Sequence, residues 1–369
     1  MIMMKFFTKK NIGIVCLLFV FLFTFSCSSD DDTIDGTNPE ELPLDKLAIE
    51  FRPQFAVGKT IEIGISTVAD KPIAVDFGDG KPIQFTTDKN SKAITGKIVS
   101  KNMKIYINNP GDVDTFFVEG GVETINVTRV TNLRYLEISG PYTPDTSAVL
   151  LKTIDLTKNP KLFSLSVQNN ALTSIDLSNK AILNQLNLSN NKLSSIDLKS
   201  LPLLSRLNLD NNLNLTTVDI SGNPELSFID LSYNEKLTSI NVTKQPKLKD
   251  LRLYNTPITA LNLTSNTLLE DLTIESTKIA TIDLSKNTNL EKFNASNAPL
   301  ISASFTNNKK LSLVRIHRTS LTQTALTSAL NTLHNLNIAN KEVLVTKANA
   351  TSAAITSTTN KGWKVTLVE

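Results

Sequence analysis

The sequence predicts a mainly β solenoid, on three observations. A phrase of alternating apolar residues recurs every 21 or 22 residues through the middle of the chain. Each period holds two half-turns, shown by LFSLSV at 162–167 and LTSIDL at 172–177. The flanking segments lack this period: β-type residues dominate before it, and helical spacing follows it. We therefore expect coils of 21–22 residues between an N-terminal β-module and a C-terminal α/β cap.

The half-turns form two rows that are nearly in register. First half-turns begin at Leu133, Leu162, Leu183, Leu204, Leu226, Leu248, Leu269, Leu290 and Leu311. Second half-turns begin at Leu151, Leu172, Leu193, Leu215, Leu237, Ile258, Ile279 and Leu300. Alternation such as Leu186-x-Leu188 places both side chains on one face of a short strand, so each row buries one stripe.

An Asn follows many of these strands, where its amide can bond backbone groups in a turn. Stacked coils would turn these residues into ladders. The first-row ladder comprises Asn170, Asn191, Asn212 and Asn234, and it lapses at Thr256, Thr277, Ala298 and Thr319. The second-row ladder comprises Asn159, Asn223, Asn266, Asn287 and Asn308.

Residues Leu183 to Leu193, LNQLNLSNNKL, match L-x-x-L-x-L-x-x-N-x-L at every position. This segment resembles the leucine-rich repeat signature. The interposed L-T-S-I-D-L-S phrase is similar to the repeats of Bacteroidetes surface lipoproteins. The resemblance covers about Leu133 to Leu321, roughly half of the chain. It implies the fold and says little about the ligand.

The first residues are interpreted as a targeting segment. Lys5, Lys9 and Lys10 precede an apolar run over 12–25, which is short for a membrane span. Residues 1–26 resemble a lipoprotein signal with Cys27 as the lipidated residue, although Thr24 stands where Leu is usual. A plain membrane anchor or a different cleavage site remains an alternative. Residues 27–45 form an acidic tether, whose Asp30-Asp31-Asp32 run is either a solvated spacer or, by family likeness, an export signal.

Residues 46–112 are predicted to form a β-module. Asp76-Phe77-Gly78-Asp79-Gly80 is a hairpin turn that resembles the D-x-G-D-G phrase of PKD-like domains. Two carboxylates are too few for calcium, so Asp76 and Asp79 are interpreted as turn residues. The solenoid spans 113–321 and begins with a degenerate repeat at 113–131 that joins it to the module. An insertion at 141–148 is expected to protrude as a loop.

Residues 322–369 are predicted to cap the solenoid. The pattern indicates a helix over 322–336 with Thr322 as its N-cap, a strand at 343–345, a helix over 349–359 and a strand at 363–367. Trp363 is expected to fill the core of this cap.

Composition excludes several function classes. The chain has two cysteines: Cys16 leaves with the signal and Cys27 is acylated, so no disulfide or cysteine-based metal site is expected. The 38 basic and 35 acidic residues form no basic stripe, which argues against nucleic-acid binding. The two histidines, His317 and His334, are placed on the last strand and in the cap helix, without a catalytic partner set. No enzyme activity and no cofactor or metal are expected.

The two rows differ in their outward side chains. In the second row these are nearly uniform Ser/Thr and Asp/Asn, as in Ser174/Asp176, which favours a structural ladder whose carboxylates need Ser/Thr, backbone or solvent partners over a cation ladder. In the first row they change from coil to coil, as a recognition surface requires. The alternative is an ordinary unselected surface. The residues predicted to contact a ligand are Tyr135, Arg206, Phe228, Arg252, Tyr254 and Arg315.

The leading hypothesis is a non-enzymatic protein, lipid-anchored through Cys27 and exposed on the cell surface as an outer-membrane lipoprotein. Its repeat face would bind a protein or glycan, and the resemblance implies adhesion. The alternative is a structural or accessory lipoprotein subunit of an outer-membrane complex.

Overall fold

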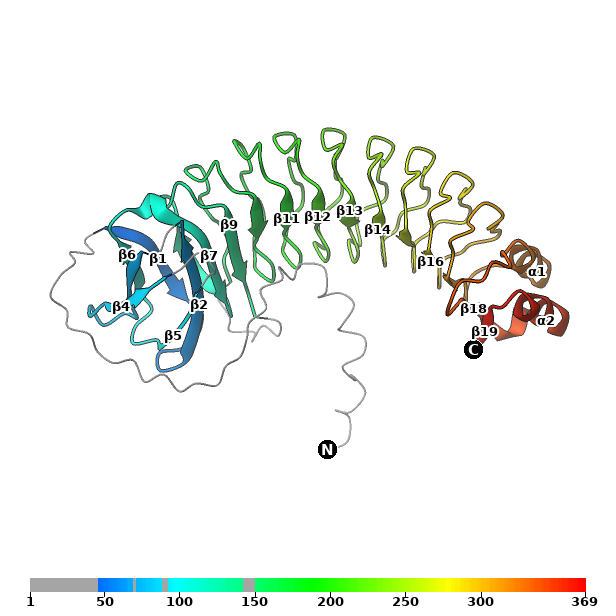
Figure 1. Ribbon diagram of the computed structural model, residues 1–369, viewed down its shortest axis with the longest axis horizontal. Helices are drawn as coiled ribbons and strands as arrows, with labels where there is room; N and C mark the ends of the chain where they lie inside the picture. The colour runs from blue at the N-terminus through cyan, green and yellow to red at the C-terminus, as the bar shows by residue number, and fades with distance from the viewer. Residues whose placement is uncertain (1–45, 69–70, 88–91, 142–149) are drawn as a thin grey trace, which may run out of the picture. The chain divides into compact units, whose positions relative to one another are not determined.

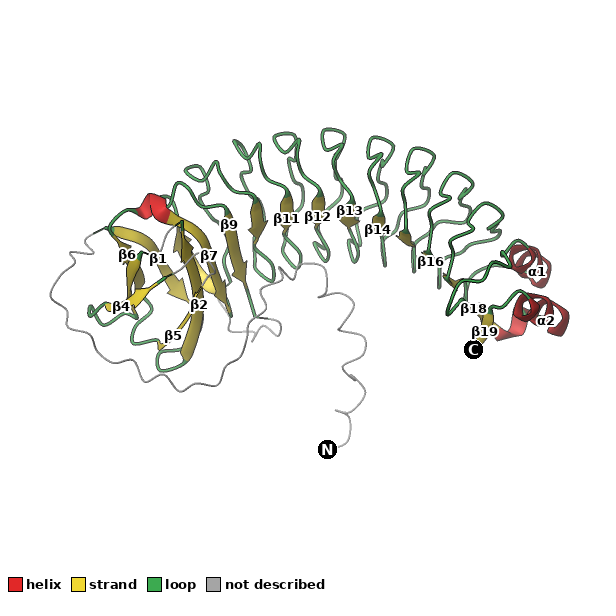
Figure 2. Ribbon diagram, viewed as in Figure 1, coloured by secondary structure: helices red, strands yellow, loops and turns green. Residues whose placement is uncertain are grey.

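The computed structural model describes residues 46–68, 71–87, 92–141 and 150–369. The predicted signal, the lipidation site Cys27, the tether and the insertion loop lie outside these residues, apart from Pro141 at the start of the insertion. Within the described residues, no helix has the length and apolar character needed to cross a bilayer. The predicted fold class is confirmed: a β solenoid with a β-module before it and an α/β cap after it (Figure 1, Figure 2).

The N-terminal module is built from antiparallel strands. Its described elements are β1 (Leu47–Pro53), β2 (Thr60–Thr67), β3 (Pro72–Asp76), β4 (Ile83–Thr86), β5 (Lys92–Lys97), β6 (Met103–Ile107), a 3-10 turn at Pro110–Asp112, β7 (Val113–Glu119) and β8 (Val122–Asn126). Five of these strands pair in the order β4-β3-β6-β1-β8. Strands β2, β5 and β7 instead belong to a second sheet that continues into the repeats.

The repeat strands are short, parallel and in register. After β9 (Tyr135–Ser139) come β10 (Ser164–Ser166), β11 (Gln185–Asn187), β12 (Arg206–Asn208), β13 (Phe228–Asp230), β14 (Asp250–Arg252), β15 (Asp271–Thr273), β16 (Lys292–Asn294) and β17 (Leu313–Arg315). The central residue of each strand faces that of the next, as Leu186 faces Leu207. The second half-turns carry no strand in the described residues.

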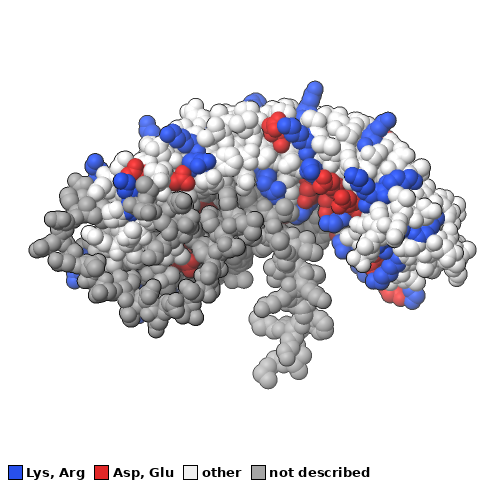
Figure 3. Space-filling model, viewed as in Figure 1, with Lys and Arg blue, Asp and Glu red and all other residues white. Residues whose placement is uncertain are grey.

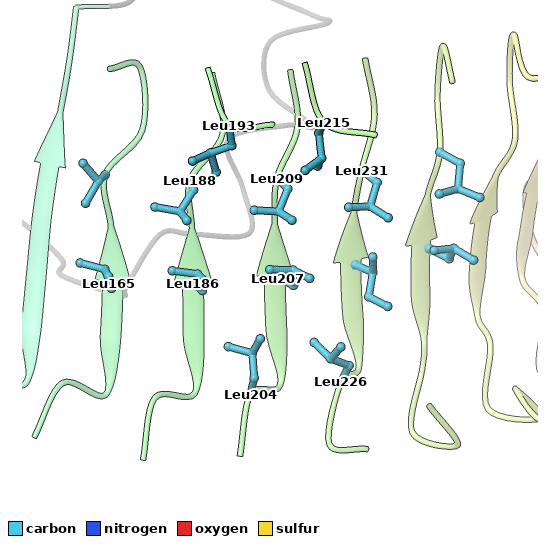
Figure 4. Packing of buried hydrophobic residues seen from close by; sticks show 14 of the residues in the cluster. Leu165, Leu186, Leu188, Leu193, Leu204, Leu207, Leu209, Leu215, Leu226 and Leu231 are labelled. Atoms are coloured by element: carbon cyan, nitrogen blue, oxygen red, sulfur yellow. The ribbon is translucent and has the colours of Figure 1, made fainter. Parts of the chain in front are cut away.

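The core is a stack of aliphatic stripes. Leu165, Leu186 and Leu207 lie side by side inside the sheet, and each is fully buried (Figure 4). Leu204 and Leu226 occupy the preceding corner, and they are fully buried too. Each such side chain contributes about 1.5–3 kcal/mol by leaving water, and its partners belong to the neighbouring coils.

Strand β7 joins the module to the solenoid. It pairs antiparallel with β2 on one side and parallel with β9 on the other, with Phe116 opposite Leu136. The first half of the degenerate repeat therefore sits in the repeat sheet, as expected. Its second half does not continue the solenoid pattern, because β8 pairs antiparallel with β1. Gly120 and Gly121, with φ of 85° and 90°, allow this turn, and a Cβ on Gly120 would collide with the ring of Phe55.

The Asn ladders are confirmed, and they hold the coils together. The Nδ2 of Asn212 donates to the carbonyls of Leu188 and Leu209 at 3.0 Å, and its Oδ1 accepts from Leu193 N at 3.1 Å. In the second row, Asn223 donates to the carbonyls of Leu198 and Leu201. At three of the four positions where the first-row ladder lapses, a Thr hydroxyl donates within its own coil, as Thr256 does to Leu253 O at 2.8 Å.

The cap matches its predicted elements closely. Helix α1 (Gln323–Asn331) has Thr322 as its N-cap, and β18 (Glu342–Thr346), a 3-10 turn at Lys347–Asn349, α2 (Ser352–Asn360) and β19 (Lys364–Val368) follow. Strand β18 extends the repeat sheet by pairing with β17. Trp363 is 1% exposed and its Nε1 donates to His334 O at 2.9 Å, as expected of a core side chain. His334 lies beyond α1 and not within it, buried against Trp363 with its Nε2 at 2.8 Å from Leu311 O.

Candidate recognition surface

We define the strand face as the outward side chains of β9 to β17, on either side of each central apolar residue. Two positions after each repeat strand from β10 onward lies a rim residue, and the next residue has a positive φ. The eight rim residues of β10 to β17 are Gln168, Ser189, Asp210, Ser232, Tyr254, Glu275, Ser296 and His317. Because the strands are parallel and in register, these positions form rows that run from coil to coil.

Three of the predicted residues meet on the central coils. The guanidinium of Arg206 lies 4.4 Å from the ring centroid of Phe228, and that of Arg252 lies 5.1 Å from it. The two arginines extend from β12 and β14, the strands on either side of β13. Phe228 is 3% exposed, so its ring supports the two cations and offers little surface of its own to a ligand.

Asp250 completes this arrangement. Its two carboxylate oxygens accept from Nε and a terminal nitrogen of Arg252 at 3.0 and 2.7 Å, a bidentate pair with both side chains largely buried. Burial disfavours the charge of Arg252, but the bonds to Asp250 outweigh that effect and raise the pKa of Arg252. The result is an arginine that is held in one orientation before any partner binds.

The remaining predicted residues lie in separate places. Tyr254 is a rim residue and makes an edge-to-face pair with Tyr233, with ring centroids 4.7 Å apart. Tyr135 is on β9, where it pairs with Phe163 and lies beside Arg134. Arg315 is on β17, at the end of the repeats next to the cap. Whether these side chains contact a ligand stays a prediction.

Carboxylates gather on the same coils. Burial, with a contribution from Asp230, raises the pKa of Asp210 to about 7, and burial also raises the pKa of Asp230 and of Asp271. Figure 3 shows acidic side chains gathered beside basic ones over the region of β14 to β16. This part of the surface therefore carries both signs of charge at close spacing, which favours a charged partner over an apolar one.

The outward side chains of the second row are bonded within their own coils. Asp176 accepts from Ser178 N at 2.8 Å and Asp219 from Ser221 N at 3.0 Å, and these backbone bonds are the first cause of their lowered pKa. Asn241 accepts from Thr243 in the same way. The structure thus confirms that these side chains have local backbone partners, which a structural ladder requires.

The described residues hold no group of three or more His, Cys, Asp and Glu that could bind a metal ion. Asp76 accepts backbone N–H bonds from Gly78, Asp79 and Gly80 at 2.7–3.0 Å, so it organises the turn as predicted. His317 lies just after β17, partly buried, and desolvation lowers its pKa.

Sequence reasoning missed three residues of the central coils: Tyr233, Asp250 and Asp210. Asp250 belongs to the first-row pairs, but its bond to Arg252 is a contact along one strand that no periodicity reveals. Tyr233 was detectable, because it occupies a position that is Asn in most other coils.

No protein-family model and no curated protein sequence matches the chain. Solved structures with the same fold do match. The functional domain of InlJ from Listeria monocytogenes, which includes a cysteine ladder, superposes with a TM-score of 0.52 and 19% identity over 73% of this chain and 66% of that chain, just under two thirds. An internalin of the same species, InlF, superposes with a TM-score of 0.53 and 18% sequence identity, and the match covers 74% of this chain and 86% of that chain. A leucine-rich repeat protein of Leptospira interrogans superposes with a TM-score of 0.50 and 17% sequence identity, and the match covers 66% of this chain and 68% of that chain. These similarities establish a leucine-rich repeat solenoid.

Proposed function

We propose that this chain is a non-enzymatic, lipid-anchored surface protein that binds a protein partner through its strand face. One observation carries the proposal: the strand face changes from coil to coil, while the second row repeats the same locally bonded side chains. A scaffold alone requires only the repeated row. Function resides in the site and not in the fold, so the proposal rests on these side chains.

The chemistry of the central coils favours a protein partner. Arg252 is held by Asp250 and Phe228, so little side-chain entropy is lost when it meets a partner. Arg and Tyr are also among the residue types that dominate binding energy in protein interfaces. The neighbouring carboxylates add charge complementarity, which increases specificity and association rate. A membrane anchor at Cys27, with Asp30–Asp32 behind it, would present this surface outside the cell and make adhesion its use.

The binding surface is tested with variants that borrow residues from adjacent coils. Arg206→Gln uses the residue at the facing position of β11, and Arg315→Asn uses that of β16. The labelled chain starting at Ser28 is applied to intact host cells and to purified matrix proteins. We expect the double variant to bind its partner at least about tenfold more weakly.

The control is a second-row pair, Thr217→Ala with Thr281→Ala, both exposed. This variant should bind as the native chain does. Unchanged binding by the strand-face variant, or loss in the control, would contradict the assignment of the face.

Location is tested separately by protease treatment of intact cells. We expect the native chain to be cleaved and a chain with Asp30–Asp32 changed to Ala to be protected. Protection of both, while a known surface protein is cleaved, would move the chain to the periplasm. The accessory-subunit hypothesis would then replace adhesion.

A further inference from the structure

The residue after each rim residue has a left-handed backbone in the repeats β10 to β17. Its φ lies between 53° and 57° at every coil, so the solenoid itself requires this conformation. Five of these eight positions are Asn, which tolerates it: Asn169, Asn190, Asn211, Asn255 and Asn297. At β13 the position is Tyr233, with φ of 56°. A left-handed backbone is energetically unfavourable for a bulky aromatic residue, so we infer that the side chain of Tyr233 has a role other than folding.

Tyr233 is 43% exposed and belongs to an aromatic pair. Its backbone N–H donates to Tyr254 O at 2.7 Å, and the two rings stand at 74° with centroids 4.7 Å apart. Two exposed or half-exposed tyrosines on adjacent coils form a platform that a flat or cationic group can contact. Aromatic faces attract cations through the negative potential of the ring.

Carboxylates lie around this pair. Asp210 and Glu275 are the rim residues of β12 and β15, whose coils flank the two coils that hold Tyr233 and Tyr254. Burial, then Tyr254, Asp210 and Glu275 raise the pKa of Tyr233 to about 12. One oxygen of Asp210 is buried and has no hydrogen-bond partner in the described part of the chain. Glu275 accepts from the side-chain amides of Asn294 at 2.7 Å and Asn297 at 3.4 Å, which are neutral. The ion pairs found among the described residues use neither Asp210 nor Glu275. Arg252 on β14 is already paired with Asp250.

We propose that Tyr233, Tyr254, Asp210 and Glu275 form a subsite for a basic side chain, Lys or Arg, of the protein partner. The cation stacks on the aromatic pair, and its charge is matched by Glu275 and by Asp210 in its ionised form. Carboxylates and aromatic faces placed together both attract a cation, which commits the subsite to a basic side chain. This inference rests on the proposed function and specifies which partner chemistry the face selects.

The test follows tyrosine signals by nuclear magnetic resonance. The sequence contains five tyrosines, at 106, 135, 142, 233 and 254, so a chain with isotopically labelled tyrosine gives few signals. The probe is Nα-acetyl-lysine methylamide, and its neutral counterpart is Nα-acetyl-norleucine methylamide. We expect saturable movement of the Tyr233 and Tyr254 signals with the lysine probe and none with the norleucine probe.

Each variant introduces a residue that other coils carry at the equivalent position, so the fold should be preserved. Tyr233→Asn introduces the residue of five other coils, and Asp210→Ser introduces that of Ser189 and Ser232 in the same row. Each should weaken binding of the lysine probe about threefold to fivefold. Thr217→Ala, an exposed residue of the second row, should leave it unchanged.

Equal movement with both probes would overturn the inference, because it would show an apolar patch. Absence of movement with the lysine probe, or full affinity in Tyr233→Asn, would overturn it as well. Failure of the proposed function is distinguishable, since that failure appears as unchanged partner binding in the Arg206→Gln, Arg315→Asn variant.

Discussion

At the scale of single residues, the Asn ladder shows how one side chain stabilises three stretches of backbone. Asn212 has no exposed surface and bonds the carbonyls of Leu188 and Leu209 and the amide of Leu193. Buried backbone groups that lose their partners cost about 1–3 kcal/mol each. The ladder therefore contributes more than its hydrogen bonds alone suggest.

We expect Asn212→Ala to lower the stability by about 1–3 kcal/mol, because the amide of Leu193 loses its acceptor inside the core and the carbonyls of Leu188 and Leu209 each lose one of their donors. The measurement is the urea midpoint followed by circular dichroism. Asn214→Ala, two residues away and exposed, is the matched control and should change stability by less than about 0.5 kcal/mol. Equal effects of the two variants would mean that the ladder is dispensable.

Asp210 makes stability depend on pH. Its pKa is raised from 3.8 to about 7, so the folded chain holds this proton more tightly than the unfolded chain does. The native state is therefore favoured below about pH 4, and this contribution is lost as the pH rises through about 7. The native chain should lose on the order of 1–3 kcal/mol between about pH 5 and pH 8.5 from this group.

Asp210→Asn removes the titrating group, so its stability should not fall in that way and should exceed that of the native chain near pH 8.5. Urea midpoints across this range decide the matter. Asp219→Asn is the control, because the pKa of Asp219 is lowered by backbone bonds and it titrates below this range. Parallel pH profiles for Asp210→Asn and the native chain would exclude Asp210 as the cause.

At the scale of elements, side chains from neighbouring strands contact one another through the Phe228 ring. Arg206 on β12 and Arg252 on β14 contact the same ring from the two sides of β13. The three coils thus share one stacked cluster, and a change in one strand alters the side-chain positions of its neighbours.

A double-mutant cycle tests this coupling. Combining Arg206→Gln with Phe228→Leu should give an interaction energy of about 0.5–1 kcal/mol, measured from urea midpoints. The control cycle combines Arg206→Gln with Arg315→Asn, on β12 and β17, and its effects should add. A cycle at Phe228 that is additive within about 0.3 kcal/mol would show that the stack contributes nothing.

At the scale of the whole molecule, each coil depends on the next, so the ends of the solenoid need covering. Strand β18 pairs with β17, and the hydroxyl of Thr332 accepts from Phe305 N at 2.8 Å. His334 adds its bond to Leu311 O. At the other end, the repeat sheet continues from β7 through β2 to β5 of the N-terminal module. Repeat proteins without such ends expose an apolar edge.

Deletion of residues 322–369 should therefore cause association, because it uncovers the last coil around Val314, which is fully buried in the intact chain. Size-exclusion chromatography with light scattering measures the result. Lys347→Ala, an exposed residue paired with Glu369, keeps the cap and should behave as the native chain does. A truncated chain that elutes as a stable monomer would show that the cap is not required.

Patterns in the sequence predicted the solenoid, its two rows, its Asn ladders and the cap. The patterns that predict them are periodic or local: Leu186 and Leu188 predict a buried stripe, and Thr322 predicts the start of a helix. Local patterns suffice here because each coil repeats the same contacts with the next one. The row in which the coils differ was also identified from the sequence, and its use as a recognition face stays a prediction.

The tertiary structure alone decided how the face is organised. It buried Phe228 beneath two arginines, paired Arg252 with Asp250, and placed Tyr233 against Tyr254 with Asp210 nearby. It also assigned β8 to the other sheet and His334 to a buried place behind α1. These outcomes depend on distances between side chains of different coils and on their burial, and periodicity carries no information about either.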